Sequence, residues 1–129
     1  MIRYILDTSA LLCYLRDEPG ADKIYSFLKK GSALHRVNLG ELYYCLLRKE
    51  GSEIASQIYG KVLQYPVTFI DDLSDAFLLT TGKLKVSYKL GYADAVVAAT
   101  AILQKATLVT KDNDFRPLVK DKVLTVQWV

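Results

Sequence analysis

The chain contains few of the residues on which several common kinds of site depend. Its 129 residues include two cysteines and one histidine. A single histidine excludes a histidine cluster for zinc, and the spacing of Cys13 and Cys45 suits no cysteine-based zinc site. Both cysteines fall in apolar helical patterns. A disulfide between them is one alternative, and two buried free thiols are the favoured one for a cytosolic chain.

Long apolar runs and linker-like stretches are also missing. No segment approaches the roughly 20 apolar residues of a membrane span. The apolar stretch near the start is broken by Asp7 and Arg16 and lacks a small-residue cleavage pattern, which argues against a signal peptide. No repeat and no segment rich in proline, glycine and serine divides the chain. We therefore expect one domain over residues 1–129, in a cytoplasmic protein with no membrane partner.

What the chain does contain is enough apolar material for a core. Hydrophobic residues make up 51% of it and the net charge is only +3, which excludes a disordered chain. The pI of about 8.8 permits a nucleic-acid partner without requiring one. The sole histidine, His35, falls in an expected strand, where a structural role is favoured over catalysis.

Hydrophobic periodicity predicts strands that alternate with helices. The expected strands cover residues 4–6, 33–37, 67–70, 107–110 and 123–126. The expected helices cover residues 9–16, 21–30, 38–50, 53–64, 92–105 and a segment capped by Asp71 or Asp72 that reaches residue 85. Such alternation predicts an α/β fold in which helices cover both faces of a parallel sheet. Sites in these folds form at the carboxyl ends of the strands.

Two aspartates directly follow expected strands. Asp7 comes after the first strand, and Asp112 comes after the fourth, taken here as residues 107–111. If both strands are parallel, both carboxylates stand at the same edge of the sheet. The alternative for each is a helix or turn cap, a role that aspartate often fills.

Two more acids lie in expected helices. Asp94 interrupts the apolar stretch YADAVVAATAIL, where an unpaired buried carboxylate costs several kcal/mol unless it is neutralised or coordinated. A first-turn position favoured by the helix dipole is the alternative. For Glu41, a capping box with Asn38 as the cap explains the residue by spacing alone.

Four converging acids would repel one another and raise their pKa values unless a cation lies between them. Oxygen ligands favour hard divalent ions, so Mg²⁺ or Mn²⁺ is the expected cofactor. Such ions activate water and stabilise charge on a phosphodiester.

Four segments of the chain resemble the PIN domain, and in particular the toxin ribonucleases of prokaryotic VapBC toxin–antitoxin pairs. They are YILDTSALL, NLGELYY, GYADAVVAATA and TLVTKDNDF, in that order along essentially the whole chain. The resemblance implies a three-layer α/β fold with a roughly five-stranded parallel sheet. It also implies cleavage of single-stranded RNA with magnesium or manganese.

The resemblance assigns roles to individual residues. The metal-binding and catalytic acids fall on Asp7, Glu41, Asp94 and Asp112, with Glu41 a direct ligand or a partner through water. The supporting residues are Ser9, Thr110 and Asp114, of which Asp114 ranks below Asp112. Lys111 and Arg116 flank the last acid and are candidates for holding RNA phosphates, although solvated surface charge is the favoured explanation for each.

The resemblance also implies a homodimer and an antitoxin partner. We expect an antitoxin tail to lie in a groove between the early helices, with the apolar faces of Leu11–Leu15 and Ile24–Leu28 as candidate linings. Ordinary core packing explains those faces equally well. Tyr43, Tyr44 and Tyr59 are more typical of an interface than of base stacking.

Three rival functions remain open on the sequence. A phosphatase of the haloacid dehalogenase type wants a second acid two residues after the first, and Ser9 stands there. A receiver domain would use Asp71 or Asp72 as its phosphate acceptor but needs an acidic pair near Asp7. A non-catalytic binding scaffold would keep the acids only as caps, and would gain no stability from manganese.

Overall fold

A five-stranded parallel sheet forms the centre of the protein. The computed structural model describes all residues 1–129 and orders the strands β3-β2-β1-β4-β5. The strands are β1 (Tyr4–Leu6), β2 (Ser32–His35), β3 (Thr68–Ile70), β4 (Thr107–Thr110) and β5 (Val126–Trp128), and every neighbouring pair is parallel. The predicted fold class is therefore confirmed.

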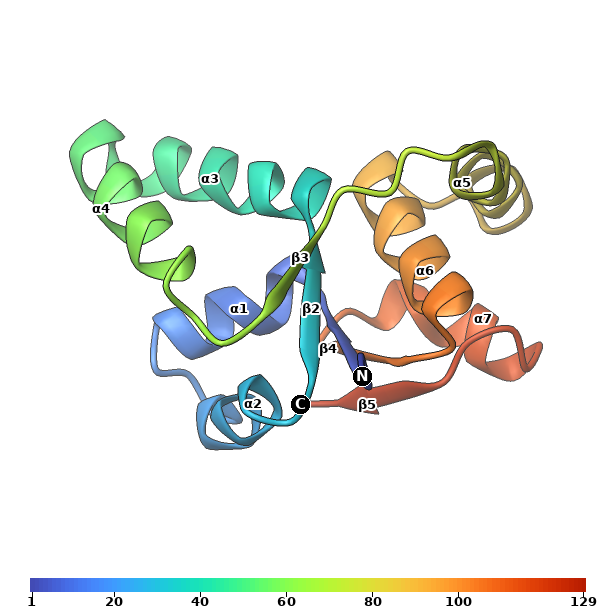
Figure 1. Cartoon of the computed structure of the whole chain (residues 1–129), viewed down its shortest axis with the longest axis horizontal. Coiled ribbons are helices and arrows are strands. Elements are labelled where there is room, and N and C mark those ends of the chain that lie inside the picture. The colour runs from blue at the N-terminus through green and yellow to red at the C-terminus, as the bar shows by residue number, and fades with distance from the viewer.

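Helices cover both faces of this sheet, which gives three layers (Figure 1). On one face lie α1 (Thr8–Leu15), α2 (Ala21–Leu28), α3 (Arg36–Glu50) and α4 (Ser52–Val62). On the other lie α5 (Asp75–Tyr88), α6 (Tyr92–Gln104), the short 3₁₀ helix η1 (Asn113–Phe115) and α7 (Arg116–Lys120).

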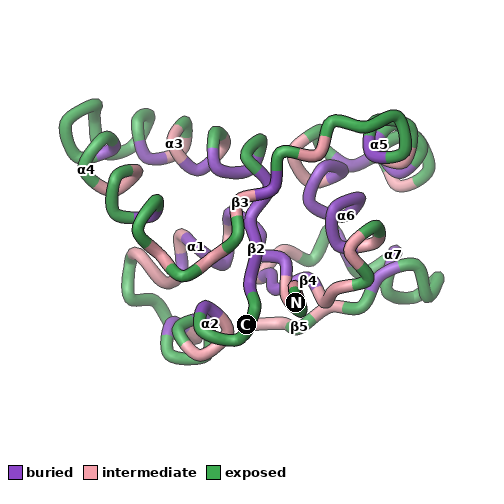
Figure 2. The backbone as a smooth tube through the Cα atoms, viewed as in Figure 1, coloured by how far each residue is buried: buried purple, intermediate pink, exposed green.

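The central strands supply side chains to both cores, because successive residues of a strand point to opposite faces. In β1, Ile5 belongs to the core under α5 and α6, whereas Leu6 belongs to the core under α1 to α4. In β4, Leu108 and Val109 divide in the same way. Burial on both faces explains why these strands read as short apolar runs (Figure 2).

Several element boundaries differ from the sequence expectation. Helix α3 begins at Arg36, two residues earlier than expected, because the Nδ1 atom of His35 accepts the Val37 amide at 3.0 Å and caps the helix. Helix α5 begins after Ser74, whose hydroxyl accepts the Phe77 amide, and it continues to Tyr88. Asp72 accepts the Ser74 amide at 2.8 Å and so forms the turn before α5.

The end of the chain also differs. The expected strand over residues 123–126 lies at Val126–Trp128, and a five-residue helix, α7, was not expected. The Val123 amide donates to the Leu118 carbonyl, which holds that residue in the turn after α7. The chain joins β4 only where the Leu108 amide donates to the Thr125 carbonyl.

The scarce residues have structural roles here. Cys13 and Cys45 are both free thiols, as favoured, but only Cys13 is buried and Cys45 is partly exposed. His35 is buried, stacks on Phe77 with ring centroids 4.7 Å apart, and its Nε2 lies 2.9 Å from the Asp72 carbonyl oxygen. None of the helices combines the length and the apolar character needed to cross a membrane.

Candidate metal centre

The pairing of β1 with β4 brings two of the predicted acids together. Leu6 is in register with Val109, so Asp7 and Asp112 both emerge at the carboxyl edge of the sheet. The Asp7 amide donates to the Val109 carbonyl at 3.0 Å, which extends the pairing up to the acid itself. Asp94 approaches from the first turn of α6. Carboxylate oxygens of these three residues all lie within 4.8 Å of one another.

Hydrogen bonds fix the carboxylate of Asp7 at both oxygens. Oδ1 accepts the Thr8 amide at 2.8 Å, so Asp7 caps α1. Oδ2 accepts the hydroxyls of Thr110 at 2.7 Å and Ser9 at 2.9 Å. Because the side chain is almost fully buried, these three donors hold it in one orientation.

The Thr110 hydroxyl links the two strand-end acids. It donates to Asp7 and also accepts the Asp112 amide at 3.0 Å. Asp112 in turn caps η1, where its Oδ1 accepts the Asp114 amide at 2.9 Å. Ser9 and Thr110 thus both contact Asp7, while Asp114 lies in the 3₁₀ helix just beyond the three clustered acids.

Glu41 reaches the same region from α3, but by a different route from the expected capping box. Asn38 lies inside α3 and does not cap it, since His35 fills that position. The capping explanation for Glu41 is therefore wrong. Its Oε1 instead accepts the Thr8 hydroxyl at 2.6 Å, which ties α3 to α1. Glu41 does not belong to the group of three within 4.8 Å.

Two residues whose contacts were not foreseen from the sequence hold these elements together. Thr8 bonds to Glu41, as described, and its hydroxyl also lies 3.4 Å from the Asn38 carbonyl oxygen. Asn38 is completely buried and donates from Nδ2 to the Ala93 carbonyl at 3.0 Å, directly before Asp94. Helical periodicity predicts neither the Thr8–Glu41 bond nor the Asn38–Ala93 bond. A buried asparagine in a helix does indicate a specific partner, because buried polar groups are hydrogen-bonded.

The acids have no cationic partner within the protein. The only ion pair joins Arg36 to Asp71 at 2.6 Å, well exposed and outside the acid group. Burial, followed by the charges of Asp7, Asp112 and Glu41, raises the pKa of Asp94 to about 7. Burial also raises the pKa of Asp7 to about 6, against the opposing hydrogen bonds from Thr110 and Ser9. A crowded set of hard oxygen donors without a counterion fits a divalent cation.

The two basic residues near the last acid point elsewhere. The Lys111 ammonium lies 3.3 Å from the Pro19 carbonyl oxygen and 3.7 Å from the Cys13 sulfur. The Arg116 guanidinium stacks on the ring of Trp128 at 4.4 Å and donates from Nε to Asn113. Its terminal nitrogens have no partner in the chain, so Arg116 is the better placed of the two to meet an anion.

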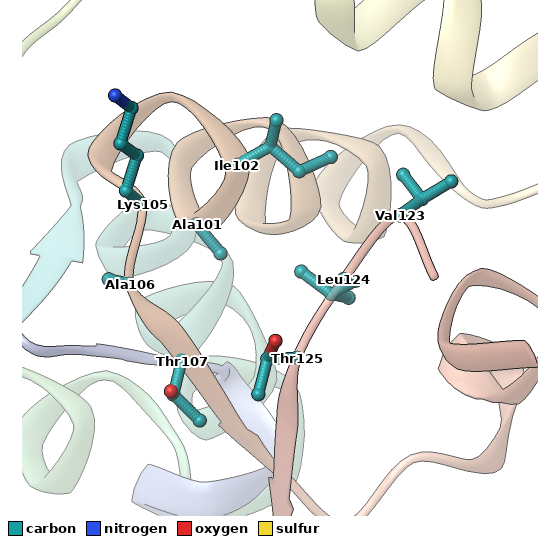
Figure 3. Close-up of a pocket in the computed structure, with 8 residues that line it drawn as sticks. All are labelled: Ala101, Ile102, Lys105, Ala106, Thr107, Val123, Leu124 and Thr125. Carbon is teal, nitrogen blue, oxygen red and sulfur yellow. The ribbon is translucent and has the colours of Figure 1, made fainter. Parts of the chain in front are cut away.

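A hollow of about 300 Å³ lies at the opposite end of the sheet from the acids. It is formed between the end of α6 and the beginnings of β4 and β5 (Figure 3). Thr107, at its wall, begins the strand that Asp112 follows. The chemistry of the acids is therefore not housed in this cavity.

Comparison with known proteins places this arrangement in a family. The PIN domain family matches residues 4–120. The chain belongs to the PIN domain family. It is also similar to "Ribonuclease VapC4" of Mycobacterium tuberculosis, with 30% identity over 95 residues that make up 70% of this chain and 73% of the relative. The resemblance stated from the four sequence segments is thereby confirmed.

Solved structures share the fold of this PIN domain. VapBC2 from Rickettsia felis, solved bound to a DNA fragment from its promoter, aligns with a TM-score of 0.75 and 22% identity over 100% of this chain and 99% of the other. VapBC-5 from M. tuberculosis, a member of the VapBC family of toxin–antitoxin systems, aligns with a TM-score of 0.64 and 21% identity over 100% of this chain and 98% of the other.

The role of Thr110 can be tested by its replacement with valine, which keeps the shape and removes the hydroxyl. We expect Thr110→Val to weaken Mn²⁺ binding about 10- to 100-fold, because Asp7 loses a donor that orients it. Isothermal titration calorimetry measures this. Thr100→Val is the matched control, since that buried hydroxyl bonds only to the Val96 carbonyl within α6. Equal Mn²⁺ affinity in Thr110→Val and wild type would contradict the role.

The raised pKa of Asp94 predicts a pH-dependent stability in the metal-free PIN domain. Because this pKa is about 7 in the folded chain against an ordinary 3.8, the folded state keeps the proton longer. Stability therefore falls as the pH rises from about 4 to about 7. Asp94→Asn removes this loss, and we expect it to be more stable than wild type at pH 8 by about 1 kcal/mol, a modest figure because water screens the half-buried side chain.

Thermal unfolding in EDTA at pH 4.5 and pH 8 measures the stability difference between Asp94→Asn and wild type, which should be much smaller at the lower pH. Asp22→Asn is the control, since Asp22 occupies the first turn of α2 as Asp94 does in α6, but is exposed. A stabilisation by Asp94→Asn that is equal at both pH values would contradict the interpretation.

Proposed function

We propose that this PIN domain is a metal-dependent endoribonuclease that cleaves single-stranded RNA, and that it is the toxin of a toxin–antitoxin pair. The observation that carries the proposal is the group of three carboxylates within 4.8 Å that has no cation from the protein. The similarity of the chain to a ribonuclease supports RNA as the substrate. We treat residues 1–129 as one domain, acting in the cytoplasm.

In this proposal Asp7, Asp94 and Asp112 hold Mg²⁺ or Mn²⁺. When bound, the cation supplies positive charge that activates water and stabilises the charge developing on a phosphodiester. Glu41 stands outside the three-acid group and is fixed through Oε1 by Thr8. This leaves Oε2 to orient a water molecule or accept its proton, so we assign Glu41 a role through water.

The hydroxyl residues keep the acids ready for this task. Ser9 and Thr110 hold Oδ2 of Asp7, and Asn38 holds the start of α6 against α3. Catalytic geometry of this kind needs side chains whose positions are fixed before substrate arrives. Ser9 also fills the position where a haloacid dehalogenase needs its second acid, and Asp71 pairs with Arg36, so neither phosphoryl-transfer alternative gains support.

The proposed antitoxin requires a surface that the folded chain leaves open. Leu11, Ile24 and Leu28 are buried in the core because α1 and α2 pack them against the sheet, so the core-packing alternative holds for these three residues of the two candidate faces. A hollow of about 390 Å³ between α3 and α4 is open instead. Its lining is Gly40, Tyr43, Ser56 and Tyr59.

We propose that an apolar segment of the antitoxin docks in this hollow. Tyr43 and Tyr59 meet edge to face there, with ring centroids 5.7 Å apart, and give an aromatic wall typical of an interface. Gly40 directly precedes Glu41, so a bound segment would lie one residue along the helix from an acid of the site. VapBC-5 is a structural relative from such a toxin–antitoxin system. We further propose that the toxin is a homodimer.

Removal of a single ligand charge tests the catalytic assignment. We expect Asp7→Asn, Asp94→Asn and Asp112→Asn each to lower the rate of Mn²⁺-dependent cleavage of single-stranded RNA by roughly 10²- to 10³-fold, since cation binding supplies several kcal/mol. Gel analysis of a labelled oligonucleotide, with an EDTA control, measures it. Asp121→Asn is the matched control, because Asp121 is an exposed acid outside the group of three and its carboxylate accepts the Tyr88 hydroxyl. Undiminished cleavage in all three variants would exclude the proposed site.

The two basic residues near Asp112 should differ in their effect on RNA binding. We expect Arg116→Ala to raise KM a fewfold and to reduce its salt dependence, because a cation that contacts a phosphate releases counterions. Lys111→Ala should leave KM nearly unchanged, because its ammonium lies against the Pro19 carbonyl. Steady-state cleavage at two salt concentrations compares them. A larger effect on KM from Lys111→Ala would reverse this assignment.

A further inference from the structure

An exposed arginine follows the last acid of the site closely but pairs with no carboxylate. Arg116 lies two residues after Asp114 and four after Asp112, at the start of α7. Opposite charges so close together attract one another. The only ion pair in the chain nevertheless joins Arg36 to Asp71. Contacts other than ion pairs therefore set the position of the Arg116 side chain, and its charge is not neutralised within the protein.

Two contacts hold the guanidinium of Arg116 in place. Its central carbon lies 4.4 Å from the centroid of the Trp128 ring, and its Nε donates to the Asn113 side chain at 2.8 Å. A guanidinium carries all its N–H donors in one plane, and these contacts occupy only one of its faces and the Nε–H. The donors on both terminal nitrogens are thus held in a fixed plane, with no acceptor in the chain.

The ring that Arg116 covers belongs to the strand that pairs with β4. Trp128 is in register with Thr110, and the Val129 amide donates to the Thr110 carbonyl at 3.2 Å. The Thr110 hydroxyl in turn donates to Asp7 at 2.7 Å. Trp128 also packs partly against the core under α5 and α6. The ring is therefore fixed at the carboxyl edge of the sheet, one strand away from the acids, and it fixes Arg116 there too.

Cover for the Trp128 ring does not by itself require a guanidinium. The aliphatic stem of any long side chain covers an aromatic ring. A planar, exposed and unpaired guanidinium matches the oxygens of a phosphate, which it binds through two parallel N–H donors. Because the ring and Asn113 keep this cation from pairing with Asp112, the acid also stays available for a metal ion.

We propose that Arg116 and Trp128 form a phosphate-binding subsite for the RNA strand beside the metal centre. Arg116 contacts a phosphate that flanks the one at the cation, and Trp128 is the positioning residue that holds the guanidinium in its plane and away from the acids. The proposal rests on the ribonuclease function proposed above and names the residue through which Arg116 is placed. Phosphate chemistry is common to RNA and DNA, so this subsite reads neither the base nor the 2′-hydroxyl.

A double-mutant cycle tests whether Trp128 acts through Arg116. We expect Arg116→Ala and Trp128→Leu each to raise the Kd for a fluorescein-labelled single-stranded RNA a fewfold, and the double variant to raise it no further. Each should reduce the slope of log Kd against log salt by about 0.7, because one phosphate contact to a single strand is lost. Trp128→Phe keeps an aromatic face and should restore most of the affinity. Fluorescence anisotropy in EDTA measures this binding without cleavage.

Arg3→Ala is the matched control for the loss of one positive charge. Arg3 is also exposed and lies over an aromatic ring, 5.7 Å from the centroid of Tyr4. It directly precedes β1, however, and so stands at the opposite edge of the sheet from the acids. Its replacement should leave the Kd and the salt slope nearly unchanged. Circular dichroism and thermal unfolding check that every variant is folded.

Trp128 is the only tryptophan in the chain, so its fluorescence reports on the subsite directly. We expect the emission of the wild-type protein to change when unlabelled RNA is added in EDTA, because a phosphate on the guanidinium alters the surroundings of the ring beneath it. This change should be lost in Arg116→Ala. Single-stranded DNA of the same sequence should produce the same change, because the contact is to phosphate.

Two results would overturn the subsite. An unchanged Kd and salt slope in Arg116→Ala would show that the guanidinium does not contact the strand. Losses from the two single variants that add in the double variant would show that Trp128 does not act through Arg116 and has only a structural role. Because binding is measured without cleavage, either result leaves the ribonuclease proposal standing if the wild-type protein cleaves RNA. A coupled loss of binding in a protein that cleaves no RNA would instead remove the ribonuclease proposal and keep the subsite.

Discussion

Mutual repulsion among the acids is the constraint on which the rest of the site depends. Asp7, Asp94 and Asp112 are held close together by three different elements, and no lysine or arginine of the chain neutralises them. Burial raises the pKa of Asp94, and the repulsion from the neighbouring acids raises it further. A sequence selected for stability alone would separate these charges or pair them, because a crowded set of carboxylates weakens the folded state whenever they ionise. Their retention at one edge of a well-packed sheet is what a cation-binding function explains.

The fold resists this repulsion by fixing the backbone on either side of each acid. The buried pairs Ile5 with Leu6 and Leu108 with Val109 fasten β1 and β4 to both cores, so Asp7 and Asp112 cannot move apart without disturbing both. Small buried residues along α6 let that helix pack closely on the sheet and bring Asp94 to the same edge. The hydrogen bonds through Thr110 then set the orientation that packing alone leaves free. Core packing thus fixes where the acids lie, and the hydroxyl groups fix how they point.

Much of this arrangement followed from the sequence, and the failures have physical causes. The parallel sheet and the meeting of Asp7 with Asp112 follow from local apolar patterns and from the rule that parallel strands end at one edge. The role of His35 as the cap of α3 could not be foreseen, because a capping histidine depends on a side-chain rotamer that tertiary packing against Phe77 selects. The contacts of Thr8 and Asn38 were not foreseen for a related reason. Their partners, Glu41 and the Ala93 carbonyl, come from other helices, and a single sequence carries no record of such contacts.

For the two acids at the strand ends, a role as a helix cap does not exclude a role as a metal ligand. Asp7 caps α1 through Oδ1, and Asp112 caps η1 through Oδ1. Each bond to a backbone amide uses one oxygen and leaves the other, which in Asp7 is the oxygen held by Thr110 and Ser9. A cap therefore costs the site nothing and gives it a carboxylate whose torsion angles are already fixed, which lowers the entropy lost on binding an ion. Aspartate is favoured at these positions for both reasons at once, so its suitability as a cap is no argument against its role as a ligand. Glu41 shows the opposite case, since it caps nothing and is oriented by a hydroxyl from a neighbouring helix.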